Sequence, residues 1–257
     1  MTRDKNMSVL KTLSFSILAG LSVNAVAAEF SFDHTGTGIG TGITPVGKLA
    51  WEQSLPSYSY SEEDGSKISS YSTDVLLRTG LAEGLELQLT WDGPIWQQAK
   101  TGKNKVSTHG LGDVTVGLKK AIDLNDDKMA MAVLAQATIA TGNKEFTNDK
   151  DIYLVGSVVE YAQNDDLTTA ITMMYEVQDG HWAVTAVPTI EYNIIGNWSG
   201  FSELVYRKAE SQDVEYNLGS GIIYTINDRA QVDGTIGIDL NGDQKGYQAG
   251  FGFSYLF

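Results

Sequence analysis

The sequence contains no cysteine, four prolines in 257 residues, and little positive charge. Without cysteine the chain has neither disulfide bonds nor thiolate metal sites. Its 18 Lys and Arg residues are outnumbered by 32 Asp and Glu residues, which gives a formal net charge of −14. That balance supplies no basic patch to neutralise phosphates, so we expect no nucleic-acid partner. Disorder is not expected either, because hydrophobic residues make up 42% of the chain.

Long hydrophobic runs are absent as well. Residues 1–28 have the pattern of a signal peptide: Arg3, Lys5 and Lys11 precede a short apolar run, and Ala25–Ala28 provides small residues for cleavage. The run is too short to cross a bilayer as a helix, and no later segment is long enough. We therefore predict export, with cleavage after Ala28 or nearby. The mature chain would be either soluble in the periplasm or an outer-membrane barrel.

Residues 29–46 are rich in glycine and threonine, and Gly36, Gly38, Gly40 and Gly42 recur at every second position. A phosphate-binding glycine loop would need a preceding strand, a following helix and a closing Lys-Ser/Thr, and this stretch has none of them. We interpret residues 29–46 as a flexible N-terminal lead or a small insert into a barrel lumen.

What the sequence does contain is alternation of apolar with small or polar residues at a period of two, most clearly in its last stretch, Gly246–Phe257. One face of that strand would carry Phe251, Phe253, Tyr255 and Phe257, and the other would carry small or polar residues. A soluble sheet could turn such aromatics toward its core. A membrane barrel turns them toward lipid and the small residues toward a wet lumen. The terminal Phe257 with alternate aromatics also resembles the strand that barrel-assembly machinery recognises.

Similar segments of about ten residues, the length that a tilted strand needs to cross a bilayer, follow one another from residue 47 onward. Alternation is clear in several and blurred in Ile152–Ala162 and Trp198–Lys208, whose faces stay unassigned. The predicted strands are Gly47–Pro56, Ser69–Gly80, Gly84–Gly93, Gly112–Ile122, Lys128–Ala140, Ile152–Ala162, Leu167–Val177, Trp182–Ile194, Trp198–Lys208, Val214–Ile226, Ala230–Leu240 and Gly246–Phe257.

The connections between these segments alternate in length. Every second one is a short turn, whereas most of the others are longer and hydrophilic, including Ser57–Ile68, Pro94–Leu111 and Thr141–Asp151. Outer-membrane barrels sort their connections in this way, with the short turns in the periplasm. Aromatic residues recur at the predicted strand ends, as membrane interfaces favour. The sequence therefore predicts an all-β protein, a transmembrane antiparallel up-and-down β-barrel of about twelve strands over residues 47–257.

Several strings in the sequence resemble one family. They are GKLAWE at Gly47–Glu52, LLRTGLAEGLEL at Leu76–Leu87, GLGDVTVGLKK at Gly110–Lys120, Thr141-Gly142, Gln231–Gly234 and the terminal Gly250–Phe257. Together they resemble the outer-membrane proteins named for the meta-pathway of phenol degradation, over essentially the whole mature chain. The family's acidic-proline opening is replaced here by Asp33-His34-Thr35. The resemblance implies transport of small, often aromatic or hydrophobic compounds, and no enzyme activity.

Alternation turns many polar side chains toward the lumen, where water or partners must be available to them. A barrel of about twelve strands lies between filled and open barrels, so we expect a narrow lumen. The excess of acidic groups would favour cations or neutral solutes. The inward set is Glu52, Asp74, Arg78, Glu86, Gln88, Asp92, Asp113, Lys119, Gln136, Glu191, Glu203, Asp233 and Gln248.

One group within this set is more specific. If Gly80 faces Gly84 across a three-residue turn, Arg78 lies opposite Glu86, with Lys119 on the next strand and the same inner face. We hypothesise a charge network of Arg78, Glu86 and Lys119 near the periplasmic mouth. Such a network could be a structural staple between strands or a selectivity constriction.

Other chemistry has little support. Ser107 and His109 could form a hydrolase site at the barrel rim, but no orienting group can be named. The acidic stretches 123–127 and 239–243 lack the bidentate Glu that completes a calcium loop, so we expect neither metal nor cofactor. The sequence thus favours an outer-membrane pore or transporter of a Gram-negative bacterium, with lipid, barrel-assembly machinery and small solutes as partners. The alternative is a non-conducting structural or surface-interaction barrel, plugged by its N-terminus and loops.

Overall fold

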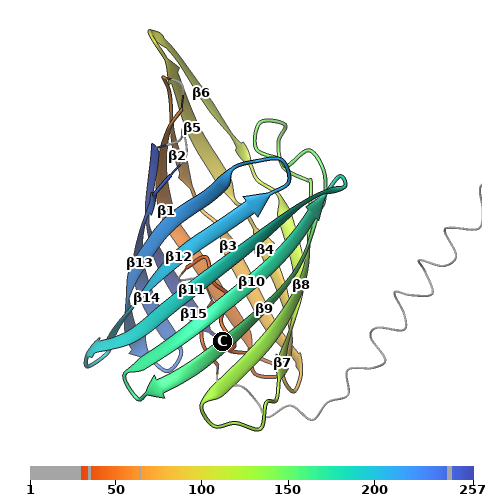
Figure 1. Ribbon diagram of the computed structural model, residues 1–257, viewed down its shortest axis with the longest axis vertical. Helices are drawn as coiled ribbons and strands as arrows, with labels where there is room; N and C mark the ends of the chain where they lie inside the picture. The colour runs from red at the N-terminus through yellow and green to blue at the C-terminus, as the bar shows by residue number, and fades with distance from the viewer. Residues whose placement is uncertain (1–29, 34–35, 64, 242–244) are drawn as a thin grey trace, which may run out of the picture.

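The computed structural model describes residues 30–33, 36–63, 65–241 and 245–257, which form fifteen antiparallel strands (Figure 1). The predicted signal peptide, residues 1–28, lies outside the described residues. Within the described part, no helix is long and apolar enough to cross a membrane. The strands are β1 Leu49–Glu63, β2 Ser66–Ser72, β3 Val75–Ala82, β4 Leu85–Trp91, β5 Pro94–Thr101, β6 Asn104–Leu111, β7 Val114–Ile122, β8 Met129–Ile139, β9 Ile152–Asn164, β10 Leu167–Gln178, β11 His181–Ile195, β12 Trp198–Ala209, β13 Val214–Asn227, β14 Ala230–Asp239 and β15 Lys245–Leu256.

Twelve of these strands close into a barrel. The sheet runs from β15 through β14 to β7, then β4, β3 and β1, and β1 pairs back onto β15. The closing seam pairs Ala50 with Leu256 and Leu55 with Phe251, and the Phe257 N–H donates to the Leu49 carbonyl at 2.8 Å. Closure leaves the barrel without a free edge, as a lipid environment requires. The predicted twelve-strand barrel is confirmed.

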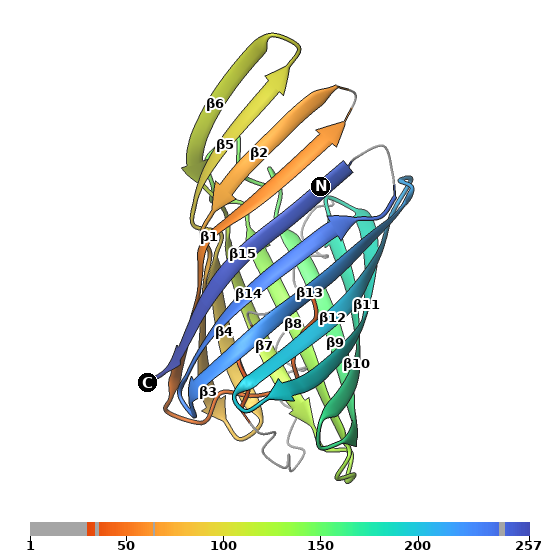
Figure 2. The ribbon, with the colours of Figure 1, turned by 90° about the vertical axis from the view of Figure 1, so that its left-hand side faces the viewer.

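The three remaining strands form an extension above one rim of the barrel, where β1, β2, β5 and β6 lie side by side (Figure 2). Here three sequence predictions were wrong. The first strand continues past Pro56 to Glu63, the expected loop Pro94–Leu111 is the β5–β6 hairpin, and Ser69–Gly80 is two strands that are interrupted at residues 73–74. These segments consist mostly of polar residues, so they lack the continuous apolar alternation that marks the barrel strands.

The interruption at residues 73–74 has counterparts in the neighbouring strands. Together these breaks separate the extension from the barrel wall. Residues 73–74, 92–93 and 112–113 each separate an upper strand from a lower one. At the centre of this line, Gly93 has φ of +36°, and a Cβ there would lie 1.7 Å from the Thr73 carbonyl oxygen. Only glycine permits that close approach.

The barrel is apolar outside and charged inside. The largest fully buried side chains include Arg78, Lys119 and Glu52, whereas Phe251 is 68% exposed on the outer face. A soluble core would show the reverse distribution. The outer face is therefore the one suited to hydrocarbon. The alternation over Gly246–Phe257 holds, and Phe253 packs edge-on against Trp51 with ring centroids 6.2 Å apart.

Aromatic side chains gather on the outer face near both ends of the barrel. Tyr206 and Tyr216 pair at one end with ring centroids 5.5 Å apart, and Trp198 and Tyr224 pair at the other at 4.8 Å. Membrane interfaces favour aromatic rings at these two levels. The short turns lie at the Trp198 end, where the chain also enters β1 and leaves β15. We take this end as periplasmic.

A lysine in place of Phe251 should destabilise the barrel in lipid, because its charge would face hydrocarbon from the middle of β15. The expected loss is about 2–4 kcal/mol of unfolding free energy. Gln248→Lys is the control, because Gln248 faces the lumen from the same strand and should cost less than about 1 kcal/mol. Urea unfolding in vesicles measures both variants, and equal losses would contradict the assignment of faces.

Candidate functional site: the channel lumen

The N-terminal chain crosses the barrel lumen. Residues 30–33 and 36–46, here called the inner segment, start beside β1, reach β12 and β10, and return to β3. Val46 bridges to Gly80 just before β1 begins. Of the two interpretations of residues 29–46, the described residues therefore support the lumen insert over a free lead.

Four wall glutamates hold the backbone of the inner segment. Glu52 of β1 accepts from the Asp33 N–H at 2.8 Å, and Glu86 of β4 accepts from the Thr44 N–H at 2.6 Å. Glu160 and Glu203 act in the same way from the opposite wall, and their contacts are described next. An extended segment with few side chains cannot satisfy its own N–H groups, so inward carboxylates serve as its partners.

On that opposite wall, Glu160 of β9 accepts from the Thr41 N–H at 2.8 Å and from its hydroxyl at 2.6 Å. Glu203 of β12 accepts from the Thr37 N–H at 2.9 Å and from the Gly38 N–H at 3.3 Å. A Cβ at Gly36 would lie 2.9 Å from Glu203 Oε2, so glycine lets the backbone approach this carboxylate. The segment is thus fixed at both sides of the lumen.

Arg78 is the centre of the contacts near β3. Its Nε and Nη2 donate to the two oxygens of Glu86 at 2.9 and 3.1 Å, and Nη1 donates to Glu52 Oε1 at 2.9 Å. Its remaining donors reach the carbonyls of Ser31 at 2.7 Å and Gly42 at 2.8 Å. All five guanidinium N–H groups therefore have acceptors, and two of those acceptors belong to the inner segment.

Lys119 of β7 completes this charge cluster. Its Nζ lies 2.5 Å from Asp33 Oδ2 and 3.4 Å from Glu86 Oε1, and it donates to the Gly40 carbonyl at 3.1 Å. Lys119, Arg78 and Glu86 have no exposed side-chain area. Buried charges are tolerated only when they are paired and hydrogen-bonded, so the cluster depends on all its members together.

The structure brings Arg78, Glu86 and Lys119 together, but the predicted register was wrong. Arg78 lies opposite Gln88, and Glu86 lies opposite Gly80. A bulge between Gly80 and Ala82 takes up one residue, so the turn pairs Ala82 with Leu85. Arg78 consequently reaches Glu86 diagonally along the sheet.

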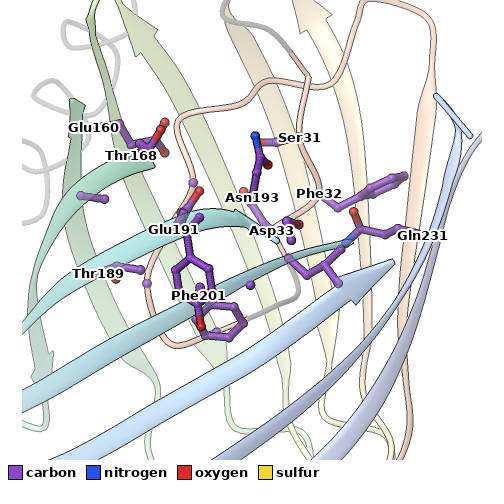
Figure 3. Close-up of a pocket in the computed structure, with 18 of the residues that line it drawn as sticks. Ser31, Phe32, Asp33, Glu160, Thr168, Thr189, Glu191, Asn193, Phe201 and Gln231 are labelled. Carbon is purple, nitrogen blue, oxygen red and sulfur yellow. The ribbon is translucent and has the colours of Figure 1, made fainter. Parts of the chain in front are cut away.

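A cavity of about 590 Å³ lies between the inner segment and the wall formed by β9–β14 (Figure 3). It includes turn residues at the periplasmic end, such as Asp166 and Asp228. Glu160 and Glu191 line it together with Phe32 and Phe201. The cavity therefore combines carboxylates with aromatic rings and contains no Lys or Arg among its lining residues.

Other predicted lumen residues take varied places. Glu203 and Asp233 are buried, 6% and 7% exposed, and Glu191 lines the cavity. Asp74 lies between β2 and β3, where it accepts from the Ser54 hydroxyl.

Asp113 was expected on the wall of a strand but lies between β6 and β7 at the rim. It accepts from the N–H groups of Thr141, Gly142 and Asn148 at 2.7–2.9 Å. Burial opposes its charged form, but these hydrogen bonds to Asn148 and Gly142 hold its pKa below the usual range. Asp113 therefore anchors the connection between β8 and β9.

A second cluster lies on the inner wall toward the extracellular end. Arg207 of β12 contacts Glu176 of β10 at 2.5 Å and Glu215 of β13 at 3.7 Å. Unlike the Arg78 cluster it has no contact with the inner segment among the described residues. The set of candidates drawn from the sequence included none of these three residues.

Sequence reasoning also missed Glu160 and Asp33. Glu160 lies on β9, whose alternation is blurred in the sequence, and Asp33 belongs to a segment without periodicity. One signal could have found them: a Gly-rich segment leaves many backbone donors unpaired, and inward carboxylates are the acceptors available in a lumen.

The alternatives with other chemistry gain no support. Ser107 and His109 both lie on β6 but form no hydrogen bond with each other in the described structure. No group of three or more His, Cys, Asp or Glu side chains in the described ranges is placed to hold a metal ion.

Arg78→Ala should lower stability strongly, because it removes the guanidinium that pairs with the buried carboxylates of Glu52 and Glu86. The expected loss of unfolding free energy is about 3–5 kcal/mol, measured by heat modifiability and urea titration. Arg207→Ala is the control, since the Arg207 side chain is 35% exposed and its pairing should contribute less. A comparable loss in both variants would contradict the central place of Arg78.

Comparison with solved structures supports the fold. An outer membrane channel from Pseudomonas putida F1 aligns with a TM-score of 0.68 at 14% identity, over 83% of this chain and 96% of that one. The translocator domain of the autotransporter NalP from Neisseria meningitidis aligns with a TM-score of 0.54 at 12% identity, over 97% and 96%. The NanC porin aligns with a TM-score of 0.54 at 11% identity, over 80% and 98%. At these identities the likeness concerns the outer-membrane barrel fold.

A search of the curated proteins found no match. A family model, in contrast, covers nearly all of the described chain, from residue 32 to residue 257. The match includes the inner segment from residue 32 onward, the barrel and the extension. The chain therefore belongs to the family described as "Putative MetA-pathway of phenol degradation".

Proposed function

We propose that this protein is a passive outer-membrane channel for small solutes. The observation that carries the proposal is a closed barrel whose lumen is crossed by a hydrogen-bonded segment, with a cavity of about 590 Å³ beside it. The solved barrel of the Pseudomonas channel and the family membership support a transport role. Because the inner segment occupies part of the lumen, the path is narrow and suits small molecules only.

The lining of the cavity supports a solute class. Phe30, Phe32, Phe201 and Ile223 provide apolar contact, whereas Glu160 and Glu191 provide negative charge. Aromatic rings favour flat apolar groups and cations, and carboxylates disfavour anions. Uptake of small aromatic or hydrophobic compounds that are neutral or cationic fits this surface, and the family's description points to phenol-like compounds.

The inner segment also supports a second candidate, a non-conducting barrel with a permanent plug. Its backbone is fixed by Glu52, Glu86, Glu160 and Glu203 on four different strands. If those contacts never open, the protein would act as a structural or surface-interaction barrel. Steady current through the purified full chain in planar bilayers separates the two candidates.

Loosening the segment should increase the current. Glu160→Ala/Glu203→Ala removes the acceptors for Thr37, Gly38 and Thr41 while the Arg78 cluster stays intact. We expect larger or more frequent openings in planar bilayers, because an unpaired N–H group gains by moving into water.

A second test uses two small organic cations as blockers of the current. Benzylammonium should interrupt the current at lower concentrations than tetramethylammonium, which has no aromatic ring to pack against the rings that line the cavity.

The matched control is Glu176→Ala/Glu215→Ala. It removes two carboxylates from the same lumen, so it changes the charge equally, but it does not touch the inner segment. The same increase in both variants would mean that charge alone sets the current. No current in any of them would favour the permanently plugged barrel.

A further inference from the structure

The outer face of the extension carries a row of lysines. Lys67 of β2 pairs directly with Lys100 of β5, and Lys100 pairs with Lys105 of β6. All three side chains are exposed. We call Lys67, Lys100 and Lys105 the lysine row. Cross-strand neighbours on one face are about 5 Å apart at Cβ, so the row is a compact positive strip.

This strip is unexpected in such an acidic chain. Residues 66–72 and 94–111 contain four lysines and no Asp or Glu, although the whole chain has a net charge of −14. Like charges directly opposite each other destabilise a sheet. Among the described residues, Lys67 is the one member of the row with an ion pair, since Glu62 lies 3.3 Å from its Nζ. The arrangement therefore points to an anionic group outside the protein as the partner.

Below the lysine row, an aromatic row lies on the same face. Tyr58 packs against Tyr71 with ring centroids 5.0 Å apart and against Tyr247 at 5.9 Å, and Tyr71 pairs in register with Trp96. Tyr247 shares the outer face of β15 with Phe251. The aromatic row thus continues the apolar surface of the barrel at the level of the outer membrane interface.

The spacing between the rows fits a lipid headgroup. Lys67 lies four residues from Tyr71 along β2, and Lys100 lies four residues from Trp96 along β5. Four residues of strand span about 13 Å. With aromatic rings at the interface, the lysines stand just above it, at the depth of headgroup phosphates. Lysine stems can extend along the apolar surface while the ammonium reaches the phosphate.

We propose that the lysine row and the aromatic row together form a docking surface for the phosphorylated glycolipid of the outer leaflet. The lysines bind headgroup phosphates, and the aromatic rings pack against the upper acyl chains and sugars. Orientation argues against solute capture, because the row faces away from the lumen. The inner face of the extension presents uncharged residues at Ser57, Ser59, Ser70 and Gln97.

The test titrates purified full-length protein in detergent with diphosphorylated lipid A and counts bound lipid by native mass spectrometry. Lys67→Ser/Lys100→Ser/Lys105→Ser should weaken binding on the order of tenfold to a hundredfold, and the corresponding triple Arg variant should retain it. Binding to the unaltered chain should fall as salt rises. Dephosphorylated lipid A should bind weakly to every variant.

The control is Lys48→Ser/Lys128→Ser/Lys150→Ser, three exposed lysines that belong to neither row. It removes the same charge and should leave binding unchanged. Equal affinity of the row variant and the unaltered chain would overturn the proposal, as would an equal loss in the control. Pyrophosphate that binds as tightly as lipid A with the same lysine dependence would show a phosphate site that does not use lipid. Channel current does not enter these readouts, so the result is independent of the proposed transport function.

Discussion

Hydrocarbon offers no hydrogen-bond partner to a peptide group, and this constraint determines the architecture. A sheet in lipid must close on itself, which the pairing of β1 with β15 accomplishes. Closure then inverts the usual distribution of side chains. Apolar residues such as Phe251 remain outside, and the buried side chains of the barrel are largely charged or polar. The inner segment occupies the polar interior that closure creates.

That interior places a second demand on the chain. Inward glutamates need hydrogen-bond donors, and an extended glycine-rich segment needs acceptors. The inner segment and the wall meet both needs at once, with Glu52, Glu86, Glu160 and Glu203 as acceptors. Arg78 and Lys119 neutralise much of the resulting negative charge and bind carbonyls of the same segment. The staple between strands and the selectivity constriction, posed as alternatives from the sequence, would use this same set of residues, because the contacts that join the strands lie where the inner segment crosses the lumen.

The barrel could be predicted because alternation is strong wherever one face meets lipid and the other meets water. Most of the predicted barrel strands end within two residues of the observed bounds. The extension could not be predicted in this way, since β2, β5 and β6 lie beyond the barrel rim and consist mostly of polar residues without such a pattern. Among the site residues, the inward direction of Arg78, Glu86 and Lys119 can be predicted from the alternation along their strands. Their register cannot, because a one-residue bulge at Gly80 and Ala82 leaves no clear mark in the sequence. Glu160 and Asp33 needed the path of the inner segment, which depends on contacts between residues more than a hundred positions apart.

The absence of cysteine allows the position of the inner segment to be tested directly in the membrane. A Cβ at position 38 would lie 3.4 Å from Thr189 Oγ1, close enough for Gly38→Cys/Thr189→Cys to form a disulfide. Ile190 is the neighbouring residue on the outer face, 49% exposed, so Gly38→Cys/Ile190→Cys is the matched control. Mild oxidation of cells followed by non-reducing electrophoresis should show a cross-linked band for the first pair and none for the second. No cross-link in the first pair, or equal cross-linking in both, would contradict a segment held inside the barrel by its wall.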